Sequence, residues 1–252
     1  MRILMVYPQP DQSKKPRFGF SYEMLTIATI LSKYHSVIVK DYSCECRNDE
    51  WLDSQLKNRT MDIVLVECDS YALKRSQNIL HAKWITEQCA GVVPVIAYGN
   101  YCYITKKEFA SASYTVCKNN INEIITCING LTHSPSIPLV QEYDDLPFIN
   151  RTLLQEIDFY KKNRINTLLQ TAKGCENTCI FCQRKGWQSH YVTHSDKYVL
   201  DELRLVKDQG YRNIWVTDEN FTFNISRAKR LLKKMYSLSL SDGLNMFISS
   251  WA

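Results

Sequence analysis

Three cysteines in the second half of the chain are the residues best suited to chemistry. Cys175, Cys179 and Cys182 fall within eight residues, directly after Gly174. The thiolate form of cysteine is a metal ligand, and three thiolates at positions i, i+4 and i+7 of one loop can converge on a single inorganic centre. The spacing therefore predicts a metal site in this loop.

Two kinds of metal site fit three cysteines on one loop. A structural zinc site is tetrahedral and usually draws its ligands from two separated pairs, so His190 or His194 would have to supply the fourth ligand. A [4Fe-4S] cluster normally takes four thiolates, and three cysteines would leave one iron open to a small molecule. Spacing alone leaves these two interpretations open, together with unliganded thiols.

The other seven cysteines are scattered through the first half of the chain, several of them inside apolar runs. A free cysteine in such a run acts as a small hydrophobic side chain. We therefore expect packing roles for Cys44, Cys46, Cys68, Cys89, Cys102, Cys117 and Cys127.

The composition is that of an ordinary folded protein. Of 252 residues, 45% are hydrophobic and 23% are charged, which argues against disorder. The net charge of +5 is spread thinly, so we expect no nucleic-acid partner. The apolar run at the start of the chain is too short for a signal peptide, because it ends at Pro8. No run of 18 uncharged apolar residues is present. We therefore expect a cytoplasmic protein with no membrane partner.

The first half alternates apolar, strand-like runs with helical segments. Continuous apolar strands between amphipathic helices are typical of a parallel sheet that is covered on both faces. We therefore expect residues 1–130 to form a doubly wound, flavodoxin-like α/β domain, with ligands bound beyond the carboxyl ends of its strands. The expected strands are residues 2–7, 36–39, 62–67, 93–98 and 113–116, and the expected helices are residues 21–33 and 120–128, the second stopped by Gly130.

The chain changes character after the first domain. Prolines and the lack of a helical period predict a linker over residues 131–164. Residues 165–252 then predict a βαβαβ unit. Its expected strands are residues 166–172, 212–217 and 246–250, and its expected helices are residues 197–209, with Gly210 as the cap, and 226–236.

The cysteine loop resembles the signature of the radical S-adenosylmethionine (SAM) superfamily. Its spacing is Cys-x3-Cys-x2-Cys, with the aromatic Phe181 before the last cysteine, at the end of a strand that opens a βα repeat. Residues 144–148, 172–175 and 215–222 follow one another as in radical SAM enzymes with an amino-terminal cobalamin-binding domain. The resemblance implies such a domain over residues 1–130 and a partial (βα) barrel over residues 165–252.

The resemblance also implies roles for individual residues. The three cysteines would hold three irons of a [4Fe-4S] cluster, and the fourth iron would bind SAM. The main chain near Phe181 would contact the adenine, and Asp218, Glu219 and Asn220 would lie where the family holds the methionine amine. We favour Glu219 because a carboxylate suits an ammonium, although an acidic residue at a strand end can instead cap the next helix.

The activity implied by the resemblance is reductive cleavage of SAM to a 5′-deoxyadenosyl radical, with cobalamin-associated methyl transfer to a small molecule or peptide, or a related radical modification of it. An electron donor of the flavodoxin or ferredoxin type would be needed. The alternative is a truncated or degenerate module of the same fold that binds a metal or a partner without catalysis. It predicts zinc or no metal, and no cleavage of SAM.

Two features depart from the family pattern. The first half lacks the Asp-x-His-x-x-Gly motif that ligates cobalt in other cobalamin domains, and Tyr98 stands where the family tends to have glycine. We expect Tyr98 to add bulk where backbone and ligand approach closely.

Residues 165–252 leave room for only about three barrel repeats of roughly 30 residues. We expect a longer chain or a second chain to complete the barrel.

Overall fold

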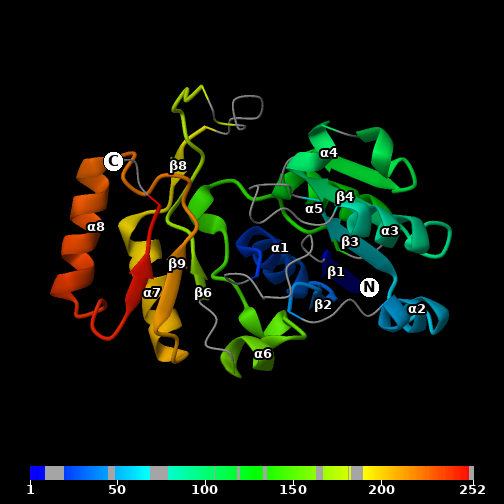
Figure 1. Ribbon diagram of the computed structural model, residues 1–252, viewed down its shortest axis with the longest axis horizontal. Coiled ribbons are helices and arrows are strands. Elements are labelled where there is room, and N and C mark those ends of the chain that lie inside the picture. Colours follow the sequence, from blue (N-terminus) through cyan, green and yellow to red (C-terminus); the bar gives the residue numbers. More distant parts are fainter. Residues whose placement is uncertain are drawn as a thin grey trace. The chain divides into compact units, whose positions relative to one another are not determined.

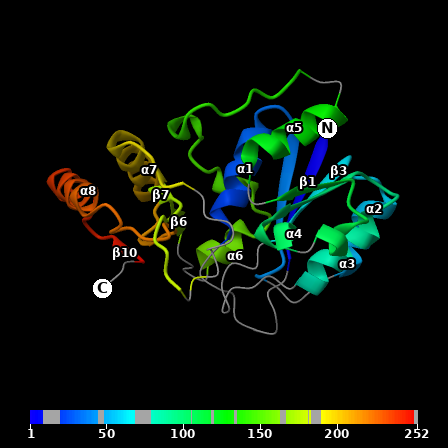
Figure 2. The same ribbon diagram turned by 90° about the horizontal axis from the view of Figure 1, so that it is seen from above.

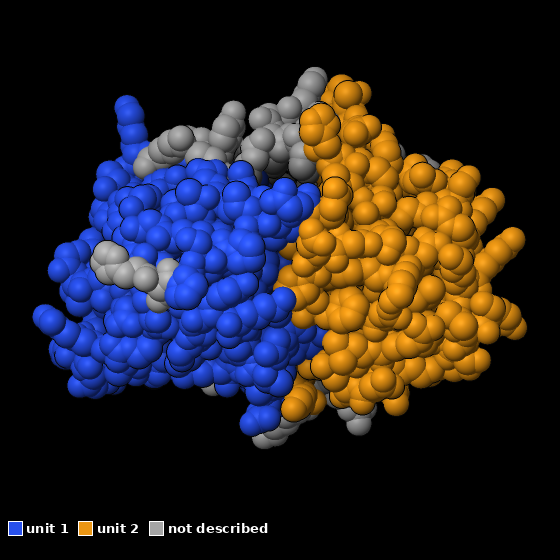
Figure 3. All heavy atoms as spheres, turned by 180° about the vertical axis from the view of Figure 1, so that it is seen from behind, with its two compact units in different colours: residues 1–17, 23–141, 149–159 blue, residues 18–22, 142–148, 160–252 orange. Residues whose placement is uncertain are grey.

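The computed structural model describes most of the chain, in two compact units that Figure 3 colours separately. Unit 1 comprises residues 1–17, 23–141 and 149–159, and unit 2 comprises residues 18–22, 142–148 and 160–252. The described residues are 1–8, 20–44, 49–68, 79–104, 106–117, 120–132, 135–162, 167–180, 182 and 190–249.

Unit 1 is built on a parallel sheet of five strands with the order β2-β1-β3-β4-β5. This is the order of a flavodoxin-like, doubly wound sheet, so the expected fold class is confirmed. Most strand residues are buried, including all of β3 and β4, as a sheet covered on both faces requires. The strands are β1 (Arg2–Tyr7), β2 (Ser36–Asp41), β3 (Ile63–Glu67), β4 (Val95–Gly99) and β5 (Tyr114–Cys117).

Helices cover both faces of this sheet (Figures 1 and 2). One face packs against α2 and α3 in a single apolar core, and α1 and α5 lie on the other side (Figure 2). Among the described residues, no helix has the length and hydrophobicity needed to cross a membrane. The helices are α1 (Tyr22–Ser32), α2 (Asp49–Lys57), α3 (Ile79–Cys89), α4 (Asn100–Ile104), the 3-10 turn η1 (Lys106–Phe109) and α5 (Ile121–Leu131).

Helix α5 extends further than the sequence predicts. Its first turn is capped by Asn120, and it continues through Gly130 to Leu131. A glycine inside a helix costs only about 1 kcal/mol relative to alanine. The buried face of Ile124, Ile125 and Ile128 stabilises the helix enough to outweigh that cost.

Residues 135–140 of unit 1 pack against helix α5. The side-chain amide of Asn122 accepts from the backbone N–H of Val140 and donates to its carbonyl, both at 2.9 Å. Asn129 makes the same pair of 2.9 Å contacts with Ile137. Two asparagines therefore hold residues 135–140 along the helix in place of a sheet ladder.

A later segment protects the open edge of the sheet. After the 3-10 turn η3 (Arg151–Leu153), Leu154 pairs in parallel with Val39 of β2, and the N–H of Gln155 donates to the Val39 carbonyl at 3.0 Å. Glu156 is buried; it forms an ion pair with Lys40 and accepts from the Asp41 N–H at 3.0 Å. An exposed strand edge invites pairing with other chains, and this segment covers part of it.

Unit 2 contains the predicted βαβαβ arrangement, in a parallel sheet with the order β10-β9-β6. Its apolar core joins one face of the sheet to both helices. The elements are β6 (Thr167–Leu169), α7 (Asp196–Asp208), β9 (Asn213–Val216), α8 (Ile225–Ser237) and β10 (Asn245–Phe247), preceded by the 3-10 turn η2 (Tyr143–Asp145) and by α6 (Ile157–Lys162). Gly210 follows α7 with φ +86°, which suits the expected glycine cap.

The strand predicted over residues 166–172 is two strands. After β6 ends, β7 (Ala172–Lys173) pairs antiparallel with β8 (Val192–Thr193) in a separate two-stranded sheet. The break falls at Thr171, whose N–H is bound by the carboxylate of Asp218 and not by a neighbouring strand. Apolar periodicity does not detect such a break because the residues on both sides of it are buried.

The buried pair that covers the sheet edge predicts a stability effect. Replacement of Lys40 by methionine would leave the Glu156 carboxylate buried without its cation. We expect Lys40→Met to lower the free energy of unfolding by about 3 kcal/mol in urea titrations. The double variant Lys40→Met, Glu156→Leu should lose less than the single variant. Equal stability of wild type and Lys40→Met would contradict the pairing.

Candidate functional site

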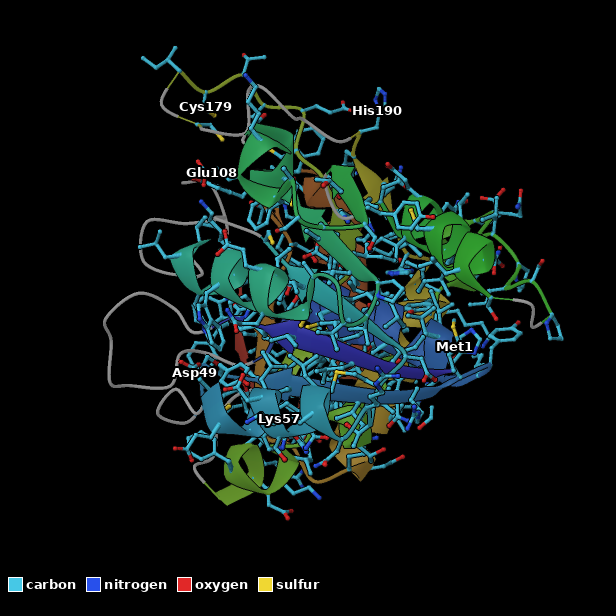
Figure 4. All side chains as sticks on the ribbon, turned by 90° about the vertical axis from the view of Figure 1, so that its right-hand side faces the viewer. Met1, Asp49, Lys57, Glu108, Cys179 and His190 are labelled. Carbon is cyan, nitrogen blue, oxygen red and sulfur yellow. The ribbon has the colours of Figure 1, made fainter. Side chains whose placement is uncertain are left out.

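The cysteine loop begins at β7 and returns to the sheet at β8. Gly174 opens it with φ +89°, a conformation that side-chain-bearing residues rarely adopt. Cys175, Cys179 and Cys182 are partly buried free thiols, and the Cys182 N–H donates to the Cys179 carbonyl at 3.0 Å. Figure 4 shows Cys179 and His190 on this loop. The last two cysteines are thus held in one tight turn.

The three thiols share the loop without being gathered around one point. Within the described ranges, no three histidine, cysteine or acidic side chains are placed as ligands of a common metal ion. The donor chemistry nevertheless suits a thiolate-bound metal centre, since none of these cysteines is in a disulfide. Phe181, predicted to contact the adenine, lies outside the described residues.

The two histidines considered as a fourth zinc ligand differ in their surroundings. His190 is exposed. His194 is 1% exposed and its Nδ1 lies 2.9 Å from Oδ1 of Asp144, so it points into the fold. A zinc site that uses His194 would have to take its buried Nε2 as the ligand, because Asp144 already binds Nδ1.

Asp218 holds the strand that leads into the loop. One carboxylate oxygen accepts from the N–H groups of Thr171 at 2.7 Å and Ala172 at 3.0 Å, and the other accepts from the Thr171 hydroxyl. Burial raises the pKa of Asp218, while the hydrogen bonds from Thr171 and Ala172 act in the opposite direction. The described contacts of Asp218 are therefore structural.

Glu219 reaches the first residue of the loop. Its Oε2 accepts from the Gly174 N–H at 2.8 Å, directly before the first cysteine. Asn220 accepts instead from the N–H and hydroxyl of Thr222 at 3.1 and 3.0 Å, which closes a turn after β9. Of the three residues predicted to hold the methionine amine, Glu219 is the one in direct contact with the cysteine loop. The cofactor-binding roles of all three stay predictions.

Arg227 of α8 is a site residue that sequence reasoning missed. It is 5% exposed, and its guanidinium donates to the hydroxyl and carbonyl of Thr171 at 3.1 and 2.8 Å and to the carbonyl of His194 at 3.1 Å. A signal was present, because Arg227 lies in phase with Ala228, Leu231 and Met235 on the buried face of the helix. A cation on an apolar face indicates a buried acceptor.

His194 lies in an aromatic stack. The rings of Tyr143 and Tyr198 flank it with centroid distances of 4.0 and 3.7 Å. Asp144 accepts from Nδ1 and also from the N–H of Ser195, at 3.0 Å, which caps α7. Burial is the main cause that lowers the pKa of His194 to about 4, against the opposing effect of Asp144. The ring is therefore neutral at pH 7.

The predicted ligand edge of unit 1 is described only in part. Residues 9–19 and 69–78, which belong to two of its three loops, lie outside the described residues. The bulk expected of Tyr98 at this edge stays a prediction. Val95 and Ala97 of β4 belong to the core on the α2 and α3 face, so Tyr98, which is fully buried, points to the opposite face. Gly99, with φ +128°, forms the edge itself.

Comparison with known proteins gives the fold a family context. No family model matches the chain. Among curated proteins, tryptophan 2-C-methyltransferase of Streptomyces laurentii is 26% identical over an alignment of 102 residues. The match covers 38% of this chain and 16% of that enzyme.

Two solved structures match nearly the whole chain. The radical SAM methyltransferase TsrM from Kitasatospora setae, with cobalamin and a [4Fe-4S] cluster bound, has a TM-score of 0.67 at 18% identity and covers 97% of this chain and 53% of its own. The cobalamin-dependent radical SAM enzyme OxsB, with aqua-cobalamin and SAM bound, has a TM-score of 0.69 at 14% identity and covers 98% and 38%. The chain has the fold of cobalamin-dependent radical SAM enzymes. It spans about half the length of TsrM and less of OxsB.

The neutral state of His194 predicts a pH effect in this radical SAM fold. The unfolded chain takes up a proton near pH 6.5, and the folded chain only near a pKa of about 4. Stability should therefore fall as the pH is lowered through this window, with about 3 kcal/mol due to His194. We expect His194→Asn to reduce the loss of unfolding free energy between pH 7 and pH 4. His190→Asn, at an exposed site on the same loop, should leave that loss unchanged, and an equal loss in all three proteins would contradict the assignment.

Proposed function

We propose that this chain belongs to a cobalamin-dependent radical SAM enzyme that catalyses methyl transfer to a small molecule or peptide. The observation that carries the proposal is the position of the three-cysteine loop, which follows β6 and β7 at the start of the βα unit, in a chain that shares the fold of such enzymes over 97% of its length.

Cys175, Cys179 and Cys182 would hold three irons of a [4Fe-4S] cluster. All three are partly buried free thiols on one loop, and a tight turn joins the second to the third. A bound cluster would supply the electron for reductive cleavage of SAM to methionine and a 5′-deoxyadenosyl radical. The chain itself supplies orientation and keeps water away. An electron donor of the flavodoxin or ferredoxin type is the partner this reaction requires.

Glu219 is the best candidate for contact with SAM. Its carboxylate lies at the start of the cysteine loop, where it accepts from Gly174, and a carboxylate favours an ammonium group. The main chain near Phe181 would contact the adenine. Asp218 would act mainly by holding the residues before the cysteine loop, because its described contacts are to Thr171 and Ala172. Asn220 would act mainly by holding the turn after β9, because its described contacts are to Thr222.

Unit 1 would hold cobalamin. In a sheet of this order the ligand binds beyond the carboxyl ends of β1 and β3, where the strand order reverses. TsrM and OxsB carry cobalamin in their structures, which supports the assignment. Methyl transfer is the reaction we infer from this pairing of cofactors.

A second candidate is a module of the same fold that binds a metal or a partner without catalysis. It is favoured by the separation of the three thiols in the part of the chain that the structure describes. It predicts zinc or no metal, and no SAM cleavage.

Electron paramagnetic resonance distinguishes the two candidates. Anaerobic reconstitution with iron and sulfide should give about four irons per chain and, after reduction, a [4Fe-4S] signal that changes when SAM is added. Cys179→Ala should lose most of the signal because one iron loses its ligand. Cys127→Ala removes a cysteine of α5 outside the loop and should behave as wild type. A signal that persists in Cys179→Ala, or ignores SAM, would refute the radical SAM proposal.

Cobalamin binding is tested separately from the cluster. The chain should retain about one hydroxocobalamin per molecule through a desalting column, as measured by visible absorbance. A variant with all three loop cysteines changed to alanine should retain the same amount, since unit 1 would hold the cofactor. Loss of cobalamin during desalting of the wild type would contradict this part of the proposal.

A further inference from the structure

The two ends of the cysteine loop meet at a very short ladder. Strands β7 and β8 contribute two residues each, paired as Ala172 with Thr193 and Lys173 with Val192. The His194 N–H extends the contact by donating to the Thr171 carbonyl at 3.0 Å. An isolated two-stranded ribbon is marginally stable in water, so additional contacts must hold these ends together.

Arg227 supplies such contacts from a different element. One guanidinium nitrogen, Nη2, donates both to the Thr171 carbonyl before the loop and to the His194 carbonyl after it. The other, Nη1, donates to the Thr171 hydroxyl, which in turn donates to Asp218. One buried side chain of α8 thus connects the entering strand, the returning strand and the acidic end of β9.

The chemistry of this contact is specific to arginine. A buried cation costs free energy unless it is paired and fully hydrogen-bonded, so a residue needed only for packing would be apolar. The planar guanidinium presents several donors in a fixed fork, which the single ammonium of lysine lacks. Asp218, which binds the same threonine, balances the cation. Burial raises the pKa of Asp218, and the charge of Arg227 is among the effects that oppose this rise.

We propose that Arg227 is a positioning residue that fixes the separation of the two ends of the cysteine loop. The inference rests on the proposed function only in that the loop is taken to hold the cluster. In that enzyme Arg227 keeps the three cysteines in place relative to Glu219, and thereby sets how tightly SAM binds.

Hydrogen exchange tests, without any cofactor, whether Arg227 holds the two ends of the loop together. In cluster-free protein, we expect Arg227→Lys to speed exchange of the Ala172 and His194 amides by about tenfold or more. The matched control is Arg204→Lys, the same change at an exposed arginine of α7 that pairs with Asp201, and it should exchange like wild type. Unchanged exchange in a folded Arg227→Lys protein would overturn the proposal.

Two milder variants keep the test decisive if Arg227→Lys does not fold. Thr171→Val removes the hydroxyl but leaves both carbonyl contacts of Arg227, so a severalfold increase in exchange is expected. Thr171→Ser restores the hydroxyl and should return exchange close to the wild-type rate. Equal rates in the valine and serine variants would overturn the proposed network.

Spectroscopy on reconstituted protein tests the consequence for SAM. Arg227→Lys should take up iron as wild type does but need roughly tenfold more SAM for the same change in the paramagnetic resonance signal. Arg204→Lys should need no more than wild type. If wild type takes up no cluster, the proposed function fails, while the exchange experiment still tests whether Arg227 holds the two ends of the loop together. A wild-type SAM response in Arg227→Lys would show that Arg227 is merely structural.

Discussion

The carboxylate of Asp218 is the interaction on which the cysteine loop depends. Asp218 accepts from the backbone N–H groups of Thr171 and Ala172, and the Thr171 N–H is the donor that would otherwise continue the ladder between β6 and β9. The chain therefore leaves the three-stranded sheet and forms β7 with a different partner. Burial of a carboxylate is costly unless its oxygens are hydrogen-bonded, and three donors from two consecutive residues meet that requirement.

The residues around the loop extend the same arrangement. Adjacent residues of the chain, Asp218 and Glu219, hold two points of the entering strand, at Thr171 and Gly174. On the returning side, Asp144 binds His194 and accepts from the backbone N–H of Ser195, the N-cap residue of α7. Each end of the loop is thus anchored by a carboxylate from a distant part of the sequence.

The sheet of unit 1 could be predicted because its information is local. Most of its strands contain a continuous apolar run, such as Ile63 to Val66 of β3, and such runs are detected without knowledge of their neighbours. The cysteine spacing is equally local. The break at Thr171 and the burial of Arg227 could not be predicted in the same way, since both result from a polar contact between residues more than 40 positions apart. Periodicity indicates which face is buried, and it does not indicate which buried polar group will find a partner.

Residues 131–164, between the two predicted domains, also make polar contacts that periodicity does not predict. Prolines and the absence of a helical period predict a linker over residues 131–164, but the described part of this segment contains two 3-10 turns and the short helix α6. Asn122 and Asn129 bind its first residues through paired amide contacts, and Leu154 to Glu156 cover part of the edge of β2. Residues 142–148 belong instead to unit 2, where Asp144 meets His194. The chain therefore passes from unit 1 to unit 2 and back before the cysteine loop begins. An extended segment without periodicity can be as firmly bound as a strand, because side-chain amides and carboxylates satisfy its backbone groups in place of a ladder.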